Sequence, residues 1–205
     1  CSSDLWNCKW HYPLCLMRTT TLVEHYTTTV GSIEIIVSPR AHPPLAAEVV
    51  VEEQDTSLVL GAADTIRDTS ESYETLIEKI RRQTPLSPGH ILIQHPGKIL
   101  AIIYDLSARP VFQPEWIAQA LAEIFREMEK DRTGSLAMPL LGAEHGHYPH
   151  AAFLQVLCST ITGIPARFPE RIWLVTPATA CRDIGDWLQQ EERMRLGQVP
   201  DKPGG

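Results

Sequence analysis

Short runs of apolar and β-branched residues recur along the chain, and each run predicts a β-strand. Glycine or proline bounds most of these runs, and both residues favour turns. The run ILAIIYDL at residues 99–106 is apolar almost throughout, which is typical of a strand covered on both faces. The predicted strands span residues 19–30, 32–38, 48–53, 57–60, 90–94, 99–105, 135–141 and 171–176.

Apolar residues at helical spacing predict helices between several of these strands. Pro114 suits the first position of a helix, and an apolar stripe from Trp116 to Met128 follows it. Pro149 opens a second helix that is apolar nearly all round, which indicates a buried helix. Two more helices are predicted around residues 73–80 and over residues 179–196.

From about residue 57 onward the predicted strands alternate with helices. This alternation predicts an α/β fold with a mostly parallel sheet and helices on both of its faces. In such sheets ligands bind beyond the carboxyl ends of the strands, where loops lead into helices. Candidate binding residues are therefore expected in those loops.

The length of 205 residues suits one domain. We interpret residues 1–30 as an N-terminal extension that is irregular apart from the strand at 19–30. Residues 31–196 form the α/β domain, and residues 197–205 are a flexible tail. Because the chain opens with Cys1 rather than methionine, we expect a processed form or a piece of a longer protein.

Composition narrows the classes of partner. The net charge is −7 and the basic residues are scattered, so we expect no nucleic-acid partner. A single anionic ligand held by backbone amides remains compatible with an acidic chain. The sequence has no run of about 18 apolar residues, so it predicts no membrane span.

The five cysteines form no recognisable disulfide framework, which favours a reducing compartment. Cys8, His11 and Cys15 have spacings that could contribute to a zinc site, but no CxxC pair supports one. Buried or free thiols are the interpretation that we favour.

The segment LGAEHGHYP at residues 141–149 lies between a predicted strand and a predicted helix. Gly142 and Gly146 can take positive φ, and exposed amides leading into a helix form a concave surface of donors. Pyrophosphate would fit such a surface, although the glycines could equally serve only the geometry of a tight connection. His145, His147 and His150 invite a metal interpretation, but they would not share one face, so we assign no metal ligand. An acid–base role for Glu144 or His145 is a further alternative.

A second loop, GAAD at residues 61–64, follows the strand predicted at 57–60 and is expected beside the first loop. Asp64 could accept hydrogen bonds from a ribose hydroxyl or an adenine amine. It could equally stabilise its own loop through an Asx turn. Arg67 could face a phosphate or only water.

Together these segments resemble the macrodomain family. The resemblance rests on LVLGAAD (58–64), GHILIQHPGKILAIIYDL (89–106), SLAMPLLGAEHGHYPHAAF (135–153) and RIWLVT (171–176), and it covers roughly residues 31–195. It implies a three-layer α/β/α sandwich with a mixed, mostly parallel central sheet that binds ADP-ribose and related nucleotides.

The resemblance also implies a set of ligand-binding residues. Residues 141–148 resemble the family's second phosphate loop, which wraps the diphosphate and the distal ribose. Residues 61–64 resemble the end of the strand that carries Asn-Ala-Ala-Asn in the family. The ligand-binding residues implied are Gly61, Ala62, Ala63, Asp64, Leu141, Gly142, Ala143, Glu144, His145, Gly146, His147 and Tyr148.

Three departures from the family pattern bear on activity. Gly61 and Asp64 replace the two asparagines, and TIRDTSESYETL stands where the family has a glycine-rich first loop. The segment VSPRAHPP offers no match for the aspartate that reads adenine. These departures put hydrolysis in doubt more than binding, so we assign no catalytic residue and no cofactor.

We therefore expect a binding module, a reader or sensor, for ADP-ribose or a related NAD-derived nucleotide. The alternatives are an ADP-ribosyl hydrolase, the ligand-binding part of a membrane-anchored antiphage effector, and a structural domain whose pocket has closed. We expect a cytoplasmic location, with any membrane tether outside this chain. The sequence leaves the oligomeric state open.

Overall fold

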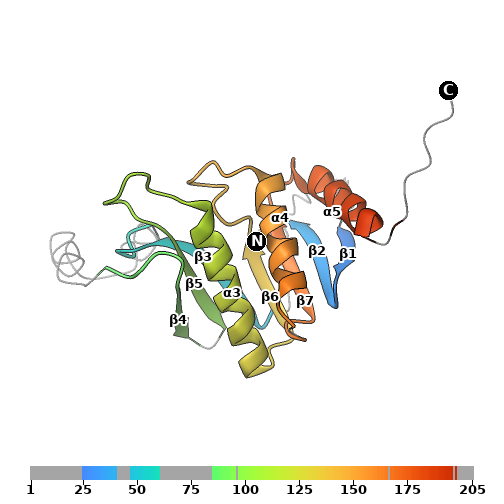
Figure 1. Cartoon of the computed structure of the whole chain (residues 1–205), viewed down its shortest axis with the longest axis horizontal. Helices are drawn as coiled ribbons and strands as arrows, with labels where there is room; N and C mark the ends of the chain where they lie inside the picture. Colours follow the sequence, from blue (N-terminus) through green and yellow to red (C-terminus); the bar gives the residue numbers. More distant parts are fainter. Residues whose placement is uncertain are drawn as a thin grey trace, which may run out of the picture.

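The computed structural model describes residues 25–40, 47–60, 85–95, 97–165, 167–195 and 197. In this part of the chain the strands form one seven-stranded sheet with the order β1-β2-β7-β6-β3-β5-β4 (Figure 1). The strands are β1 (Tyr26–Val30), β2 (Ile33–Pro39), β3 (Val49–Asp55), β4 (Ile91–His95), β5 (Lys98–Tyr104), β6 (Ser135–Pro139) and β7 (Arg171–Thr176).

The sheet is mixed and mostly parallel, as predicted. The five inner strands β2, β7, β6, β3 and β5 run parallel to one another. The edge strands β1 and β4 pair antiparallel with β2 and β5. Because the inner strands share one direction, their carboxyl ends lie along one edge of the sheet, where α/β folds place their ligands.

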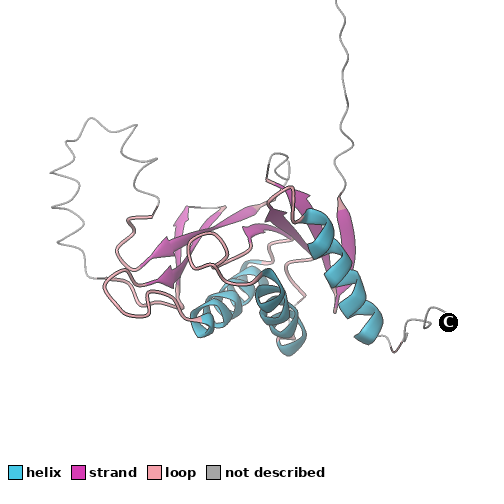
Figure 2. Ribbon diagram, turned by 90° about the horizontal axis from the view of Figure 1, so that it is seen from above, coloured by secondary structure: helices cyan, strands magenta, loops and turns pink. Residues whose placement is uncertain are grey.

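Three described helices, α3 (Pro114–Asp131), α4 (His150–Gly163) and α5 (Cys181–Arg195), cover one face of the sheet (Figure 2). Helix α3 packs on β4 and β5, α5 packs on β1 and β2, and α4 contacts both of these helices. Helix α3 has proline in its first turn and ends where Arg132 takes a left-handed conformation, with φ +55°. The helix predicted around residues 73–80 lies outside the described residues.

The core lies between the sheet and these helices. The stripe of α3 is buried as its spacing predicted, with Ile117, Leu121 and Ile124 all inaccessible to solvent. Helix α4 differs from its prediction, because Gln155 and Ser159 are exposed and only one of its faces enters the core. No helix in the described part of the chain is long and apolar enough to cross a membrane.

The strand predicted over residues 57–60 is wrong, and side chains of β3 explain why. Asp55 is fully buried, and its carboxylate accepts the N–H groups of Ser57 at 2.7 Å, Val59 at 2.6 Å and Leu60 at 2.8 Å. Amides that bond to a side chain cannot form a strand ladder, so these residues turn away from the sheet. The strand that adjoins β6 at the binding edge is β3, with Glu53 and Asp55 near its end.

Candidate functional site

The loop between β6 and α4 folds back on its first glycine. The carbonyl of Gly142 accepts the N–H groups of Gly146 at 3.1 Å and Tyr148 at 3.0 Å, and Ala143 donates its N–H to Leu140 at 3.0 Å. The N–H groups of Glu144 and His147 have no backbone acceptor among the described residues. Within that part of the chain, the loop therefore has two N–H groups without a backbone partner beside donors that are already bonded.

Positive φ occurs at Gly142, as predicted, but the second such residue is His147 and not Gly146. The φ angles are +84° at Gly142 and +51° at His147. Gly146 has a different reason to be glycine, because a Cβ atom there would lie 2.8 Å from the carbonyl oxygen of Gly142. The close return of the loop on itself, rather than an unusual φ, requires glycine at position 146.

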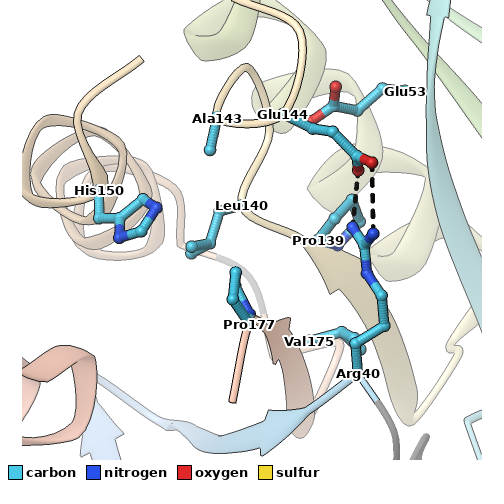
Figure 3. A pocket seen from close by; sticks show the side chains of 9 residues that line it. All are labelled: Arg40, Glu53, Pro139, Leu140, Ala143, Glu144, His150, Val175 and Pro177. Carbon is cyan, nitrogen blue, oxygen red and sulfur yellow. Dashed lines mark hydrogen bonds and ion pairs between the residues drawn. The ribbon is translucent and has the colours of Figure 1, made fainter. Parts of the chain in front are cut away.

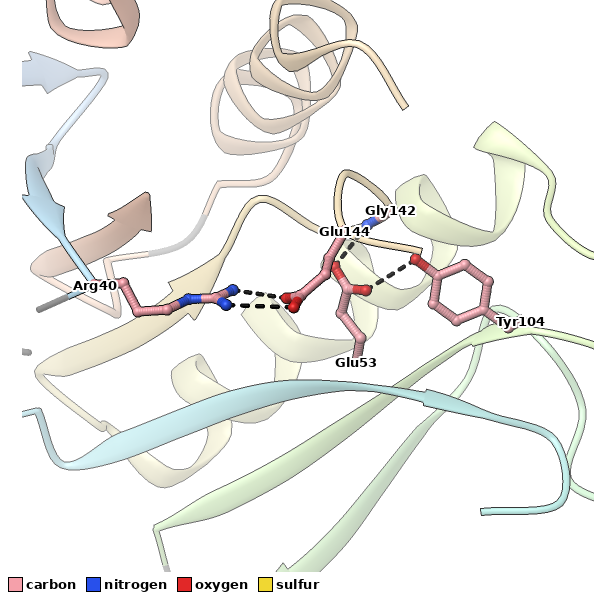
Figure 4. A network of polar contacts seen from close by, with 5 residues as sticks. All are labelled: Arg40, Glu53, Tyr104, Gly142 and Glu144. Carbon is pink, nitrogen blue, oxygen red and sulfur yellow. Dashed lines mark hydrogen bonds and ion pairs between the residues drawn. The ribbon is translucent and has the colours of Figure 1, made fainter. Parts of the chain in front are cut away.

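A buried carboxylate contacts the loop from β3. The carboxylate of Glu53 accepts the N–H of Gly142 at 2.8 Å and the hydroxyl of Tyr104 at 2.8 Å (Figure 4). Burial raises the pKa of Glu53 above its usual range, and the two hydrogen bonds oppose part of that rise. Burial also raises the pKa of Tyr104, and Glu53 adds to the effect, so the phenol stays protonated and donates.

An ion pair joins the end of β2 to the same loop. Arg40 donates from both terminal nitrogens to the carboxylate of Glu144, at 2.7 and 3.3 Å (Figure 4). This hydrogen bond lowers the pKa of Glu144 and raises that of Arg40. About half of each side chain is exposed, so the pair adds little to stability and its partners can exchange with a ligand.

Two adjoining hollows lie at this edge of the sheet. The first has a volume of about 270 Å³, and Figure 3 shows the side chains that surround it. Its apolar wall comes from Leu140, Ala143, Val175 and Pro177, while charge comes from Arg40, Glu53, Glu144 and, when protonated, His150. The second hollow, of about 570 Å³, shares Arg40, Glu53 and Glu144 with the first and extends along β3. Ligand sites commonly combine such apolar walls with a few polar groups.

The remaining predicted ligand-binding residues divide into three groups. Leu141 is fully buried in the core, and Tyr148 packs on Phe112 with ring centroids 5.5 Å apart. The rings of His145 and Tyr104 form a T-shaped pair with centroids 5.9 Å apart. Gly61, Ala62, Ala63 and Asp64 lie outside the described residues.

Among the described residues no group of three or more His, Cys, Asp or Glu side chains is arranged to hold a metal ion. Glu53 is a partly buried carboxyl group that bonds directly to the loop backbone, and its raised pKa suits a group that exchanges a proton or yields to a ligand. The loop amides, and Arg40 if it leaves Glu144, are the groups that could attract an anion.

Sequence reasoning missed Arg40, Glu53 and Tyr104. Arg40 stands in the segment VSPRAHPP, directly after β2, and its N–H bonds to the carbonyl of Thr176 at 2.8 Å. Glu53 is one of four consecutive polar residues, 52–55, that follow the valines of β3, and such a polar strand end is a detectable signal for polar groups at a binding edge. Their meeting with the loop depends on the strand order, which local patterns do not specify.

The strand order and the glycine loop at the carboxyl edge define an α/β domain with a mixed, mostly parallel sheet. More narrowly, the fold is that of a macrodomain, as the resemblance of the sequence implied. No protein-family model matches the sequence, and no curated protein matches it.

Solved macrodomains share this fold at low sequence identity. A macrodomain of Oceanobacillus iheyensis, solved with ADP, is 13% identical over 86% of this chain and 99% of its own, with a TM-score of 0.58. A mutant of the same macrodomain, solved with ADPR, is 12% identical over 85% of this chain and 100% of its own, also with a TM-score of 0.58. The macro domain of ganglioside induced differentiation associated protein 2 is 10% identical over 80% of this chain and 85% of its own, with a TM-score of 0.51.

Proposed function

We propose that this chain is a binding module, a reader or sensor, for ADP-ribose or a related NAD-derived nucleotide. One observation carries the proposal: the N–H of Gly142, a buried residue, donates to a carboxylate oxygen of Glu53 2.8 Å away, and Glu53 lines both hollows. A backbone donor in that position is suited to an anionic oxygen of a ligand as well. Macrodomains of similar fold have been solved with ADP and ADPR, which supports a nucleotide as the kind of ligand.

In this proposal the main chain holds the diphosphate. The N–H groups of Gly142, Glu144 and His147 would donate to its oxygens. Leu140, Val175 and Pro177 would supply apolar walls for the rest of the nucleotide. By the resemblance of the sequence to the family, Ala62, Ala63 and Asp64 would lie near the distal ribose.

A second candidate function is an ADP-ribosyl hydrolase. The observation that favours it is Glu53, whose carboxyl group lines both hollows and has a raised pKa. Such a group suits general acid–base work near neutral pH. A binding module and a hydrolase separate in one assay, because only the hydrolase releases ADP-ribose from a labelled ADP-ribosylated protein, and it should lose that activity in Glu53→Gln.

Titration calorimetry with ADP-ribose tests the proposed function. We expect micromolar binding, on the order of −8 kcal/mol, by the intact chain. Ala143 lines the first hollow, so Ala143→Asp would add a negative charge beside the diphosphate. Its matched control is Ala143→Asn, which has the same size without the charge.

We expect Ala143→Asp to weaken ADP-ribose binding by roughly tenfold or more, because two close like charges in a partly buried site repel by more than about 1 kcal/mol. Ala143→Asn should bind within about threefold of the wild type. Equal loss in both variants would indicate crowding rather than charge. Absence of binding to ADP-ribose, ADP and NAD by the folded wild type would reject the function.

A further inference from the structure

Two groups of the site that could bind an anion, the N–H of Gly142 and the guanidinium of Arg40, are occupied by carboxylates of the protein itself. Glu53 accepts the N–H of Gly142, and Glu144 accepts both terminal nitrogens of Arg40. All three side chains, Arg40, Glu53 and Glu144, line both hollows. A phosphate that reaches the N–H of Gly142 or the guanidinium of Arg40 therefore meets a donor that a carboxylate already neutralises.

Glu53 is the more deeply placed of the two carboxylates. Two donors from different elements converge on it, the N–H of Gly142 after β6 and the hydroxyl of Tyr104 on β5, each at 2.8 Å. An oxygen of a ligand phosphate at the N–H of Gly142 would lie within hydrogen-bonding range of the same position. Two anions at that separation in a partly buried site repel each other, so they compete for the donor.

We propose that Glu53 is a specificity-determining residue that competes with the phosphate of the ligand for the N–H of Gly142. The inference rests on the proposed function, since it concerns the same nucleotide site. A nucleotide that binds displaces the Glu53 carboxylate from the N–H of Gly142, or it binds the form of the protein in which Glu53 is protonated. This competition favours ligands that place a weakly charged phosphodiester at the loop. It disfavours ligands with a terminal phosphate, which carries more negative charge.

The surroundings make this displacement feasible. Burial destabilises the ionised form of Glu53, and nearby Glu144 adds to the effect, whereas Tyr104, Gly142 and His145 stabilise it. Arg40 faces the same group from the end of β2, and His150 lines the hollow from α4. The carboxylate is therefore held by two hydrogen bonds against a cost of desolvation, and a ligand that supplies its own anion can replace it.

The test compares ADP-ribose affinity in the wild type and in Glu53→Gln, which keeps the size of the side chain and removes its charge. We expect Glu53→Gln to bind ADP-ribose roughly tenfold more tightly, because a charge-assisted hydrogen bond is no longer exchanged for the ligand. Glu34→Gln is the matched control: Glu34 lies at the start of β2, away from the hollows, and pairs with Arg171 on the surface. It should bind like the wild type.

A pH series with the wild type and Glu53→Gln supplies a second measurement. The diphosphate diester of ADP-ribose does not titrate near neutral pH, so a change of affinity there reports on the protein. We expect wild-type affinity to rise as pH falls toward the raised pKa of Glu53, and more steeply than in Glu53→Gln. The slope that remains in Glu53→Gln measures the contribution of groups other than Glu53.

The outcomes separate the inference from the proposed function. Equal affinity of wild type and Glu53→Gln, or weaker binding by Glu53→Gln, overturns the competition while nucleotide binding stands. Parallel pH slopes in the two proteins overturn it as well. If neither protein binds any nucleotide, the proposed function fails and the competition fails with it.

Discussion

Glu53 shows how one residue can be tied to its site by contacts that are all distant in the sequence. Its partners are Gly142, 89 residues away, and Tyr104, 51 residues away. The residue itself lies at the carboxyl end of β3, where its side chain is only partly exposed. The strand fixes its position, and the loop after β6 determines what its carboxylate can bind.

The raised pKa of Glu53 predicts a dependence of stability on pH. Burial places its folded-state pKa above its unfolded value, so between those two values the folded protein holds more protons than the unfolded chain. The free energy of unfolding of the wild type should therefore fall, relative to Glu53→Gln, as pH rises through that window. Below the unfolded pKa, near pH 4, the two proteins should differ little in this respect.

Urea unfolding of both proteins at a series of pH values measures this difference, with Glu34→Gln as the control for loss of a surface carboxylate. Stability of Glu53→Gln should exceed that of the wild type most at the highest pH. A gap of the opposite sign, with the wild type gaining stability as pH rises, would show that its two hydrogen bonds outweigh the burial of the charge.

At the scale of elements, the end of β3 depends on Asp55 as much as on the strand ladder. Its buried carboxylate accepts three backbone N–H groups, from Ser57, Val59 and Leu60. The oxygen of Gln54 accepts the N–H of Leu60 at 3.0 Å as well. These bonds turn the chain out of the sheet at the edge where the site lies.

Asp55→Ala should destabilise the protein by about 2–4 kcal/mol, because it leaves several backbone donors without their acceptor. Hydrogen exchange of the Val59 and Leu60 amides should accelerate more than that of amides in the centre of β5. Glu52→Ala, three residues earlier in β3, is the comparison. It removes an exposed carboxylate that pairs with Lys98 and should cost less than about 1 kcal/mol. Similar losses in the two variants would contradict the role given to Asp55.

The elements that the sequence predicted well are those set by local pattern. The stripe of α3, with Pro114 at its start, and the apolar run of β5 were predicted close to their observed bounds. The strand at 57–60 was predicted wrongly, since its apolar residues carry no sign that Asp55 and Gln54 take their amides. Helix α4 was predicted buried all round because its few polar residues gave no indication of how much of it stays exposed.

For the candidate site, the sequence predicted the loop but not the side chains that contact it. Gly142 and its place after a buried strand could be predicted, because the backbone conformation of such a turn depends on local sequence. The approach of Arg40 and Glu53 was not, because it follows from β2 and β3 lying on opposite sides of the β6–β7 pair. A strand order of this kind is a property of the whole sheet.

At the scale of the whole molecule, the proposed function requires an acidic protein to bind an anionic ligand at the carboxyl edge of its sheet. The net charge is −7, and two carboxylates, Glu53 and Glu144, lie at the site itself. The nearby cation, Arg40, is already paired. Long-range attraction therefore cannot account for binding, and the backbone amides of the loop must provide most of it.

This balance predicts how ADP-ribose affinity responds to salt. Raising the ionic strength from about 0.02 M to about 0.5 M shortens the Debye length and screens the repulsion between the acidic surface and the diphosphate. Affinity should hold or rise by up to about threefold, in contrast to the steep loss seen when lysine and arginine neutralise phosphates. Titration calorimetry across the series measures this, with adenosine, which has no phosphate, as the control for salt effects on the apolar part. A fall of about tenfold that adenosine does not share would instead place the phosphate on Arg40, released from Glu144, and would move the main binding contact from the loop to the end of β2.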